Sequence, residues 1–240
     1  MPVKVFGSPS SAEVARVLAC LFEKDVEFQL IRVDSFRGPK LQRNNHKLQH
    51  HGESLTFEDG NVTLVESRKI LQHIADKYKN QGYKDLFGPG ELERASIELW
   101  LQTEEHSFEG PSVDMVYSLG YLPPDMPLDG RPPVAGMHPA HRQKMEEMLE
   151  MFEKSRKELG KLLDIYEQRL GEVEYLAGDK FTLADLSHLP NADHLAADPR
   201  SARLIESRRN VRRWWYTISG RDSWKRVKEL QPLPSAEAPF

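Results

Sequence analysis

Hydrophobic residues near the start of the chain switch between a spacing typical of strands and one typical of helices. Residues 3–6, Val-Lys-Val-Phe, form a short apolar run that ends at Gly7 and Pro9. After this turn, apolar side chains recur at every third or fourth position, which predicts a helix with one buried face: Val14, Val17, Leu18 and Leu21. Residues 26–33 are predicted to form a second strand, so the segment is a βαβ unit with parallel strands.

The first helix carries a start signal in the sequence. Ser10 and Glu13 stand in the S-x-x-E spacing of a capping box, in which each side chain accepts from a backbone N–H of the other residue. With Ser10 as the N-cap, Ser11 occupies the first helical position, next to unpaired N–H groups and the positive end of the helix dipole. Two interpretations follow: a doubled helix cap, or a place that holds an anion.

A hairpin and a helix complete the predicted first domain. Residues 54–57 and 62–65 are two short strands, with Asp59-Gly60 as the turn between them. The next helix places four residues on one face: Ile70, Leu71, Ile74 and Tyr78. Residues 34–52 are polar and irregular. The order βαβ-ββα predicts an α/β thioredoxin-like domain with a mixed four-stranded sheet over residues 1–80.

Beyond this domain the hydrophobic spacing is helical throughout. Three glycines and a proline in residues 81–90 mark a linker, and residues 91–230 are predicted to form an all-α helical domain. Its helices are expected at 91–108, 140–170, 211–218 and 222–230, with a proline-rich loop at 110–139 and a flexible tail at 231–240. Thr182 and Asp185 form a second capping box, and the adjacent Trp214 and Trp215 are expected in the core.

Composition narrows the class of protein. With 33 Lys and Arg against 37 Asp and Glu, the net charge of −4 provides no basic surface for a phosphate backbone, so nucleic acid is not expected as a partner. The single cysteine, Cys20, cannot form an intrachain disulfide, which favours a reducing compartment. No apolar run approaches the roughly 20 residues of a membrane span, and no secretory signal opens the chain. We therefore expect a cytoplasmic protein that does not bind membranes.

Histidines form two sequence clusters that are candidates for metal ligands: His46, His50 and His51 in one, and His138 and His141 in the other. Neither cluster has Cys or Glu at a spacing that matches a metal site. No metal site is therefore expected.

Several motifs together resemble one known family. SPSSAEVARV at residues 8–17, Glu66-Ser67-Arg68, LAGDKFTLADLSHLP at residues 176–190 and VRRWW at residues 211–215 are similar to a glutathione transferase, most closely of the plant phi class. The resemblance implies a homodimer that joins the thiolate of glutathione to hydrophobic electrophiles in detoxification. It implies no bound cofactor, since glutathione is a co-substrate. Ser11, five residues before Arg16, matches the catalytic serine of the family, with Ser8 and Ser10 as rivals.

The resemblance also implies a set of glutathione-binding residues. Glu66 and Ser67 would hold the γ-glutamyl end of glutathione, and Lys40 its glycine carboxylate. Where the family has Gln-Val-Pro with a cis proline, this chain has Glu53-Ser54-Leu55, the segment that would pair with the cysteinyl unit. A cis bond before leucine costs about 3–4 kcal/mol, so the Ser54–Leu55 bond is expected to be trans. Four residues are candidates for the lining of the hydrophobic substrate site: Ala12, Phe36, Tyr117 and Tyr121.

Two alternative functions remain open on the sequence. A non-catalytic carrier (a ligandin) of hydrophobic metabolites would use the same cleft, and the altered Glu53-Ser54-Leu55 segment keeps that possibility open. A thiol-disulfide reductase on the same fold needs a cysteine at the first turn, where this chain has serines.

Overall fold

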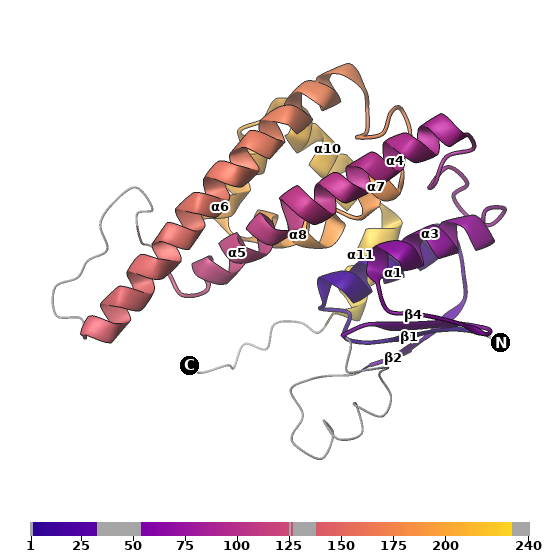
Figure 1. Cartoon of the computed structure of the whole chain (residues 1–240), viewed down its shortest axis with the longest axis horizontal. Coiled ribbons are helices and arrows are strands. Elements are labelled where there is room, and N and C mark those ends of the chain that lie inside the picture. Colours follow the sequence, from indigo (N-terminus) through magenta and orange to yellow (C-terminus); the bar gives the residue numbers. More distant parts are fainter. Residues whose placement is uncertain (1, 33–53, 125, 127–137, 232–240) are drawn as a thin grey trace, which may run out of the picture. The chain divides into compact units, whose positions relative to one another are not determined.

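The computed structural model describes residues 2–32, 54–124, 126 and 138–231 (Figure 1). The chain divides into two compact units. The first unit contains Met1–Leu101, Ala177–Pro190 and Thr217–Phe240, and the second contains Gln102–Leu176 and Asn191–Tyr216. The predicted linker at 81–90 lies inside the first unit, because two later segments of the chain return to it.

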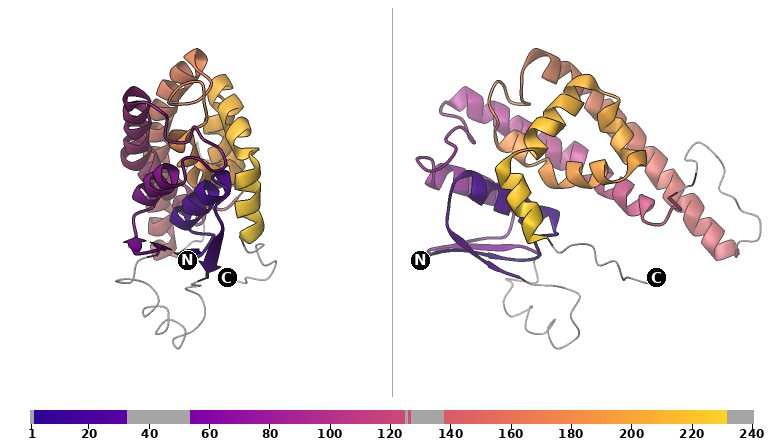
Figure 2. Two further views of the ribbon diagram at one scale, coloured as in Figure 1. Left: turned by 90° about the vertical axis from the view of Figure 1, so that its right-hand side faces the viewer. Right: turned by 180° about the vertical axis from the view of Figure 1, so that it is seen from behind.

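The first unit contains the predicted mixed sheet. Its strands are β1 (Val3–Phe6), β2 (Phe28–Ile31), β3 (Thr56–Asp59) and β4 (Val62–Leu64). They lie in the order β2-β1-β3-β4, with β1 and β2 parallel and the other pairs antiparallel. Helices α1 (Ala12–Glu23) and α3 (Ser67–Lys77) lie on the same face of this sheet (Figures 1 and 2). The thioredoxin-like prediction is thus confirmed.

The core of the first unit forms between this sheet and its two helices. All four residues of the predicted inner face of α1 are completely buried, as are the inward residues of β3 and α3: Val14, Val17, Leu18, Leu21, Phe57, Ile70, Leu71 and Ile74. Burial of each large aliphatic side chain contributes about 1.5–3 kcal/mol to stability. The hydrophobic spacing therefore predicted the inner face of α1 correctly and that of α3 except for Tyr78, which is the C-cap of α3 and is half-buried.

The segment before β3 keeps an ordinary backbone. All peptide bonds between residues that the structure describes are trans, Ser54–Leu55 included, which confirms that expectation. The side chain of Leu55 is completely buried, whereas Ser54 is exposed.

The remaining elements are helical. They are α4 (Glu91–Thr103), the π-helical η2 (Glu104–Glu109), α5 (Gly110–Leu119), α6 (Pro139–Glu172), α7 (Leu183–Leu186), α8 (Leu189–Ala197), α9 (Pro199–Glu206), α10 (Arg209–Ser219) and α11 (Asp222–Leu230). The predicted loop at 110–139 is wrong over its first ten residues, because α5 occupies Gly110–Leu119. Pro111 follows directly on the π-helical η2, and Glu109 and Gly110 keep helical dihedral angles, so α5 continues the helical run from η2 and does not start a new helix. Helix α9, which begins with a proline, was not predicted.

Helix α6 supplies much of the core of the second unit. Apolar side chains are buried along its length: Met145, Met148, Phe152, Leu159, Leu162, Leu163 and Tyr166. Tyr166 packs edge-on against Trp214 with ring centroids 6.2 Å apart. Trp214 and Trp215 are both buried, as predicted.

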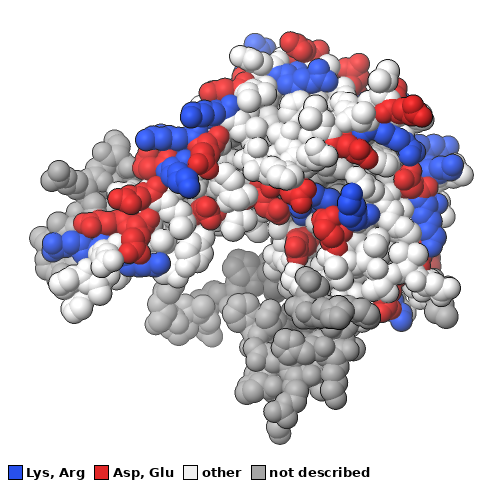
Figure 3. Space-filling view, viewed as in Figure 1, with Lys and Arg blue, Asp and Glu red and all other residues white. Residues whose placement is uncertain are grey.

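Charged side chains of both signs are scattered over the surface shown in Figure 3, and acidic and basic groups intermingle along α6. This mixture is consistent with a net charge of only −4 on the chain. None of the helices described by the structure combines the length and apolar character needed to span a membrane.

Candidate functional site

The segments of the first unit that carry Ser11, Ser54 and Glu66 meet at one end of its sheet. Strand β1 ends where β3 begins, since Phe6 pairs with Thr56, and β4 ends opposite the start of β3, since Leu64 pairs with Phe57. The turn after β1, the segment before β3 and the start of α3 therefore meet there. Segments that lie about 50 residues apart in sequence are brought together by the register of the sheet.

The turn that carries the serines is a β-turn from Ser8 to Ser11. The N–H of Ser11 donates to the carbonyl of Ser8 at 2.9 Å, and Pro9 occupies the second position, where its fixed φ is favourable. Gly7 before the turn has φ +149°, and a Cβ on it would lie 2.8 Å from the carbonyl oxygen of Ser54. Glycine therefore permits the close approach of this turn to the segment before β3.

The start of α1 differs from the prediction by one residue. Ser11 is the N-cap, with φ −75° and ψ 136°, and Ser10 lies outside the helix and is exposed. The predicted Ser10–Glu13 capping box is wrong, because the Glu13 carboxylate accepts a hydrogen bond from the Ser54 hydroxyl instead. The helix starts late because Pro9 and Ser10 are the central residues of the preceding turn.

Ser11 keeps its hydroxyl outside the helix's own hydrogen bonds. Its backbone carbonyl accepts the N–H of Ala15 at 2.9 Å, but its side chain makes no capping hydrogen bond. The residue is half-buried. A hydroxyl at the positive end of a helix dipole is suited to donate to an anion. The Ser8 hydroxyl, by comparison, accepts the N–H of Ser10 at 3.4 Å.

Glu66 and Ser67 open helix α3. Glu66 is the N-cap, and its carboxylate accepts the N–H groups of Arg68 at 2.8 Å and Lys69 at 2.9 Å. Ser67 is buried, and its hydroxyl accepts a hydrogen bond from Nη1 of Arg16 at 2.9 Å. A hydroxyl that accepts from Arg16 still has its own proton to donate.

Arg16 is a buried residue of the site to which the sequence alone assigned no role. Its side chain is completely buried, with Nη1 on Ser67 and Nε donating to the carbonyl of Ser187 at 3.0 Å. It therefore joins α1, the start of α3 and the segment after α7. The signal in the sequence was an arginine among the apolar residues of an amphipathic helix, a position where a charge must be paired.

Three candidate residues, Phe36, Lys40 and Glu53, lie outside the described residues. Ala12 is the first residue of α1 and is half-buried.

Tyr117 and Tyr121 belong to the second unit and are both about half exposed. Their hydroxyl oxygens lie 3.2 Å apart, and this hydrogen bond raises the pKa of Tyr121. The ammonium of Lys144 lies 5.3 Å from the centre of the Tyr121 ring.

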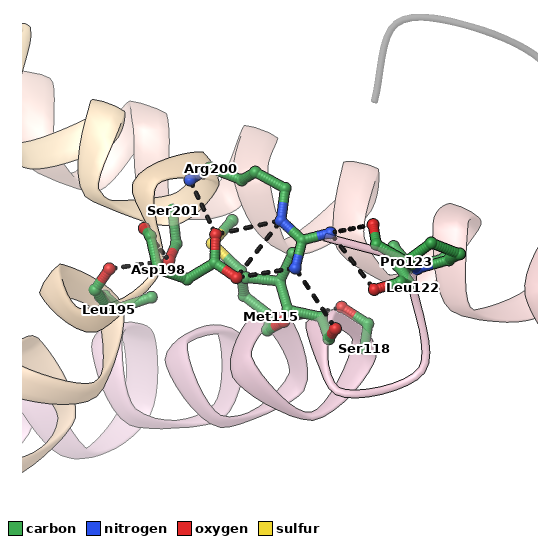
Figure 4. Close-up of polar contacts among 9 residues, drawn as sticks. Met115, Ser118, Leu122, Pro123, Leu195, Asp198, Arg200 and Ser201 are labelled. Carbon is green, nitrogen blue, oxygen red and sulfur yellow. Dashed lines mark hydrogen bonds and ion pairs between the residues drawn. The ribbon is translucent and has the colours of Figure 1, made fainter. Parts of the chain in front are cut away.

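Arg200 fixes the end of α5 that carries these tyrosines (Figure 4). Its guanidinium donates to the carbonyls of Pro123 at 2.9 Å and of Leu119 and Leu122 at 3.4 Å. It also bonds to the Asp198 carboxylate, with a shortest distance of 2.7 Å, and thereby lowers the pKa of Asp198. The carbonyls at the end of α5 are thus satisfied by a cation, which also matches the negative end of the helix dipole.

Cys20 cannot act as a nucleophile in this structure. Its side chain is completely buried in α1, with Sγ 3.9 Å from the carbonyl oxygen of Leu71. Burial raises the pKa of the thiol well above its usual range. The structure thus removes the remaining support for a thiol-disulfide reductase.

Comparison with known proteins identifies relatives over nearly the whole chain. Residues 1–76 match the family described as "Glutathione S-transferase, N-terminal domain", and residues 121–222 match "Glutathione S-transferase, C-terminal domain". Glutathione S-transferase F11 of Arabidopsis thaliana is 36% identical over 230 residues, which is 96% of this chain and 99% of the relative. Glutathione S-transferase PARB of Nicotiana tabacum is 35% identical over 97% of this chain and 99% of its own length.

Solved structures give the same result. The crystal structure of poplar glutathione transferase F1 is 41% identical, has a TM-score of 0.79, and aligns over 96% of this chain and 98% of its own. Glutathione transferase F2 from Populus trichocarpa is 42% identical, has a TM-score of 0.78, and aligns over 96% of this chain and 99% of its own.

Proposed function

The chain belongs to the glutathione S-transferase family, in its phi class, and from this premise we propose that it transfers the thiolate of glutathione to hydrophobic electrophiles. The observation that carries the proposal is the Ser11 hydroxyl, which stands at the start of α1 without a capping hydrogen bond. Glutathione is the co-substrate in this reaction, and no bound cofactor takes part.

Ser11 would act by favouring the thiolate over the thiol. A free thiol has a pKa near 8.5, so only a few per cent of it is thiolate at neutral pH. The Ser11 hydroxyl donates a hydrogen bond to the sulfur and stays un-ionised, while the positive end of α1 adds to the stabilisation of the anion. Lowering the thiol pKa by two units requires about 2.7 kcal/mol.

The chemical step then follows from the charge on sulfur. The thiol proton passes to solvent, and the thiolate attacks the electrophilic carbon to form a C–S bond. The electron pair departs with a leaving group or moves into the electrophile when the reaction is an addition. On the family likeness, we also propose that Ala12, Phe36, Tyr117 and Tyr121 line the electrophile site.

The start of α3 is suited to the γ-glutamyl end of glutathione. The Glu66 carboxylate takes the ammonium, and the Ser67 hydroxyl donates its remaining proton to the α-carboxylate near the helix N-terminus. This assignment is supported by the bond from Arg16, which occupies one lone pair of the Ser67 hydroxyl and leaves its proton for a ligand. We assign the glycine carboxylate to Lys40 and the cysteinyl unit to Glu53 and Ser54.

The test of the proposal is Ser11→Ala, with turnover of glutathione and a chloronitrobenzene electrophile as the measurement. Removing the hydrogen-bond donor to the thiolate should lower turnover roughly tenfold or more. Ser10→Ala is the matched control from the same turn and should retain most of the activity, whereas Ser8→Ala, which loses only the hydrogen bond to the N–H of Ser10, should lose less activity than Ser11→Ala. If activity survived in Ser11→Ala and fell in one of these two variants, the assignment of the turn would be wrong.

The same assay separates the transferase from the carrier of hydrophobic metabolites. A carrier would bind a hydrophobic ligand without forming the conjugate. The names of the relatives favour the transferase, and the comparisons give the carrier no support.

We also propose that the protein is a cytoplasmic homodimer. The family likeness supports the homodimer, and the single, buried cysteine fits a reducing compartment. Sedimentation should give a species of twice the 27.6 kDa chain mass. A single species of the chain mass at micromolar concentration would remove this proposal.

A further inference from the structure

Helix α11, at the end of the described chain, runs antiparallel beside α1 within the first unit (Figure 2). Its first turn is fixed to the last turn of α1. Arg221 donates to the Glu23 carboxylate at 2.6 and 2.7 Å, and the Ser223 hydroxyl donates to the same group at 2.5 Å. The opposite end of α11 therefore lies towards the start of α1.

Gln231 follows α11 as its C-cap and reaches the serine turn. Its side-chain amide donates to the carbonyl of Pro9 at 3.1 Å, a contact between residues 222 positions apart. The prediction assigned Gln231 to a flexible tail, but the structure attaches this residue to the turn that leads to Ser11.

This contact holds the central peptide group of the Ser8–Ser11 turn. The carbonyl of Pro9 and the N–H of Ser10 belong to one planar peptide unit. Gln231 binds the carbonyl side of this unit, and the Ser8 hydroxyl accepts the N–H on its other side at 3.4 Å. Rotation of the central peptide group is what distinguishes type I from type II turns, so the two hydrogen bonds oppose that rotation.

We propose that Gln231 is a positioning residue that fixes the central peptide of the Ser8–Ser11 turn and thereby the placement of the Ser11 hydroxyl. The inference rests on the proposed function of Ser11. The hydrogen bond acts through the backbone, so Gln231 itself touches no substrate. Its loss lets the peptide group rotate, and the donor to the thiolate is then aligned for only part of the time.

The test compares Gln231→Met, which keeps the length of the side chain but has no donor, with Gln231→Lys, which regains a donor. Loss of one hydrogen bond corresponds to a fall in kcat/KM of roughly three- to tenfold in Gln231→Met. The pH profile of kcat/KM should also shift to higher pH, because a less stabilised thiolate corresponds to a higher pKa of the glutathione thiol. Gln231→Lys should recover most of both quantities. Gln29→Met, at an exposed glutamine on β2 in the same unit, should change neither.

Amide hydrogen exchange supplies a readout that needs no substrate. The N–H groups of Ser10 and Ser11 should exchange faster in Gln231→Met, whereas the midpoint of urea unfolding should stay at the wild-type value. Unchanged exchange and an unchanged pH profile would overturn the proposal. A lower unfolding midpoint with an unchanged pH profile would overturn it as well, because Gln231 would then have only a structural role.

The outcome also separates this inference from the proposed function. If the wild type formed no conjugate, the transferase proposal would fail, while the exchange rates would still decide whether Gln231 holds the turn. If the wild type formed the conjugate and Ser11→Ala did not, an unaffected Gln231→Met would overturn the inference alone.

Discussion

Helices α1 and α7 of the first unit both begin after a hydroxyl residue that is followed closely by a carboxylate. At the start of α7, Asp185 accepts the backbone N–H of Thr182 at 3.0 Å and its hydroxyl at 3.2 Å, and both residues are buried. At the start of α1, Ser11 makes no side-chain cap, and Glu13 accepts from Ser54 on the segment before β3.

The difference is the direction in which the carboxylate points. An acidic side chain that turns back towards the start of its own helix satisfies the N-cap and closes that end. One that binds a neighbouring segment leaves the cap hydroxyl available to a ligand. The pair teaches that the same residue types can produce a folding element in one place and a reactive end in another.

Of the substitutions that test this comparison of the two helix starts, Asp185→Ala is expected to have the largest effect on stability. Without the carboxylate, the buried N–H of Thr182 loses its partner, which we expect to lower the free energy of unfolding by about 2–3 kcal/mol. Asp179→Ala, at an exposed aspartate shortly before α7, should change the free energy of unfolding by no more than about 0.5 kcal/mol. Urea unfolding measures both. Equal effects of the two substitutions would mean that the α7 capping box contributes no special stability.

Lowering the pH should destabilise the region around α7, because His188 lies just after this helix and is completely buried. Burial, together with the nearby charges of Arg16 and Arg68, lowers the pKa of His188 from 6.5 to about 3. The unfolded chain therefore binds a proton below about pH 6.5 that the folded chain does not bind. Stability should be full above that pH and should fall by about 2 kcal/mol by pH 5.

His188→Asn tests this prediction. Nδ1 of His188 donates to the carbonyl of Ala184 at 2.7 Å, and the asparagine amide can supply a similar donor without titrating. The loss of unfolding free energy between pH 7 and pH 5 should be smaller in this variant than in the wild type. His194→Asn, at an exposed histidine, should leave that loss unchanged, and equal losses in all three proteins would refute the role of His188.

The smallest effect is expected from Ser11→Ala on stability. The Ser11 side chain makes no capping hydrogen bond, so the free energy of unfolding should change by no more than about 0.5 kcal/mol. Thr182→Ala should cost about 1 kcal/mol or more in the same urea titration. A cost for Ser11→Ala as large as that for Thr182→Ala would show that both helix starts are structural caps.

The sequence predicted the elements whose hydrophobic spacing is regular. The inner face of α1 and the span of α11 are as expected, because apolar periodicity reports burial directly. Helix α5 was missed because prolines and glycines in residues 110–139 indicate a loop, whereas in the structure the helical run continues from η2 through Pro111.

The site was less predictable, because its arrangement depends on contacts between distant segments. The choice between Ser10 and Ser11 as the cap depended on a turn hydrogen bond from Ser11 to Ser8. The partner of Glu13 lies 41 residues away, and that of Gln231 lies 222 residues away. No local spacing records such pairs.

The burial of Cys20 protects the folded protein from forming a mixed disulfide with oxidised glutathione. Mixed disulfides form when a thiolate attacks an accessible disulfide, so an exposed cysteine in contact with oxidised glutathione would be gradually converted to a glutathione adduct. The only cysteine of this chain lies within the packed face of α1, with its thiol held in the protonated form. The folded protein can therefore meet glutathione in every redox state without being modified by it, and a thiol-reactive dye would label only molecules in which α1 has come away from the sheet.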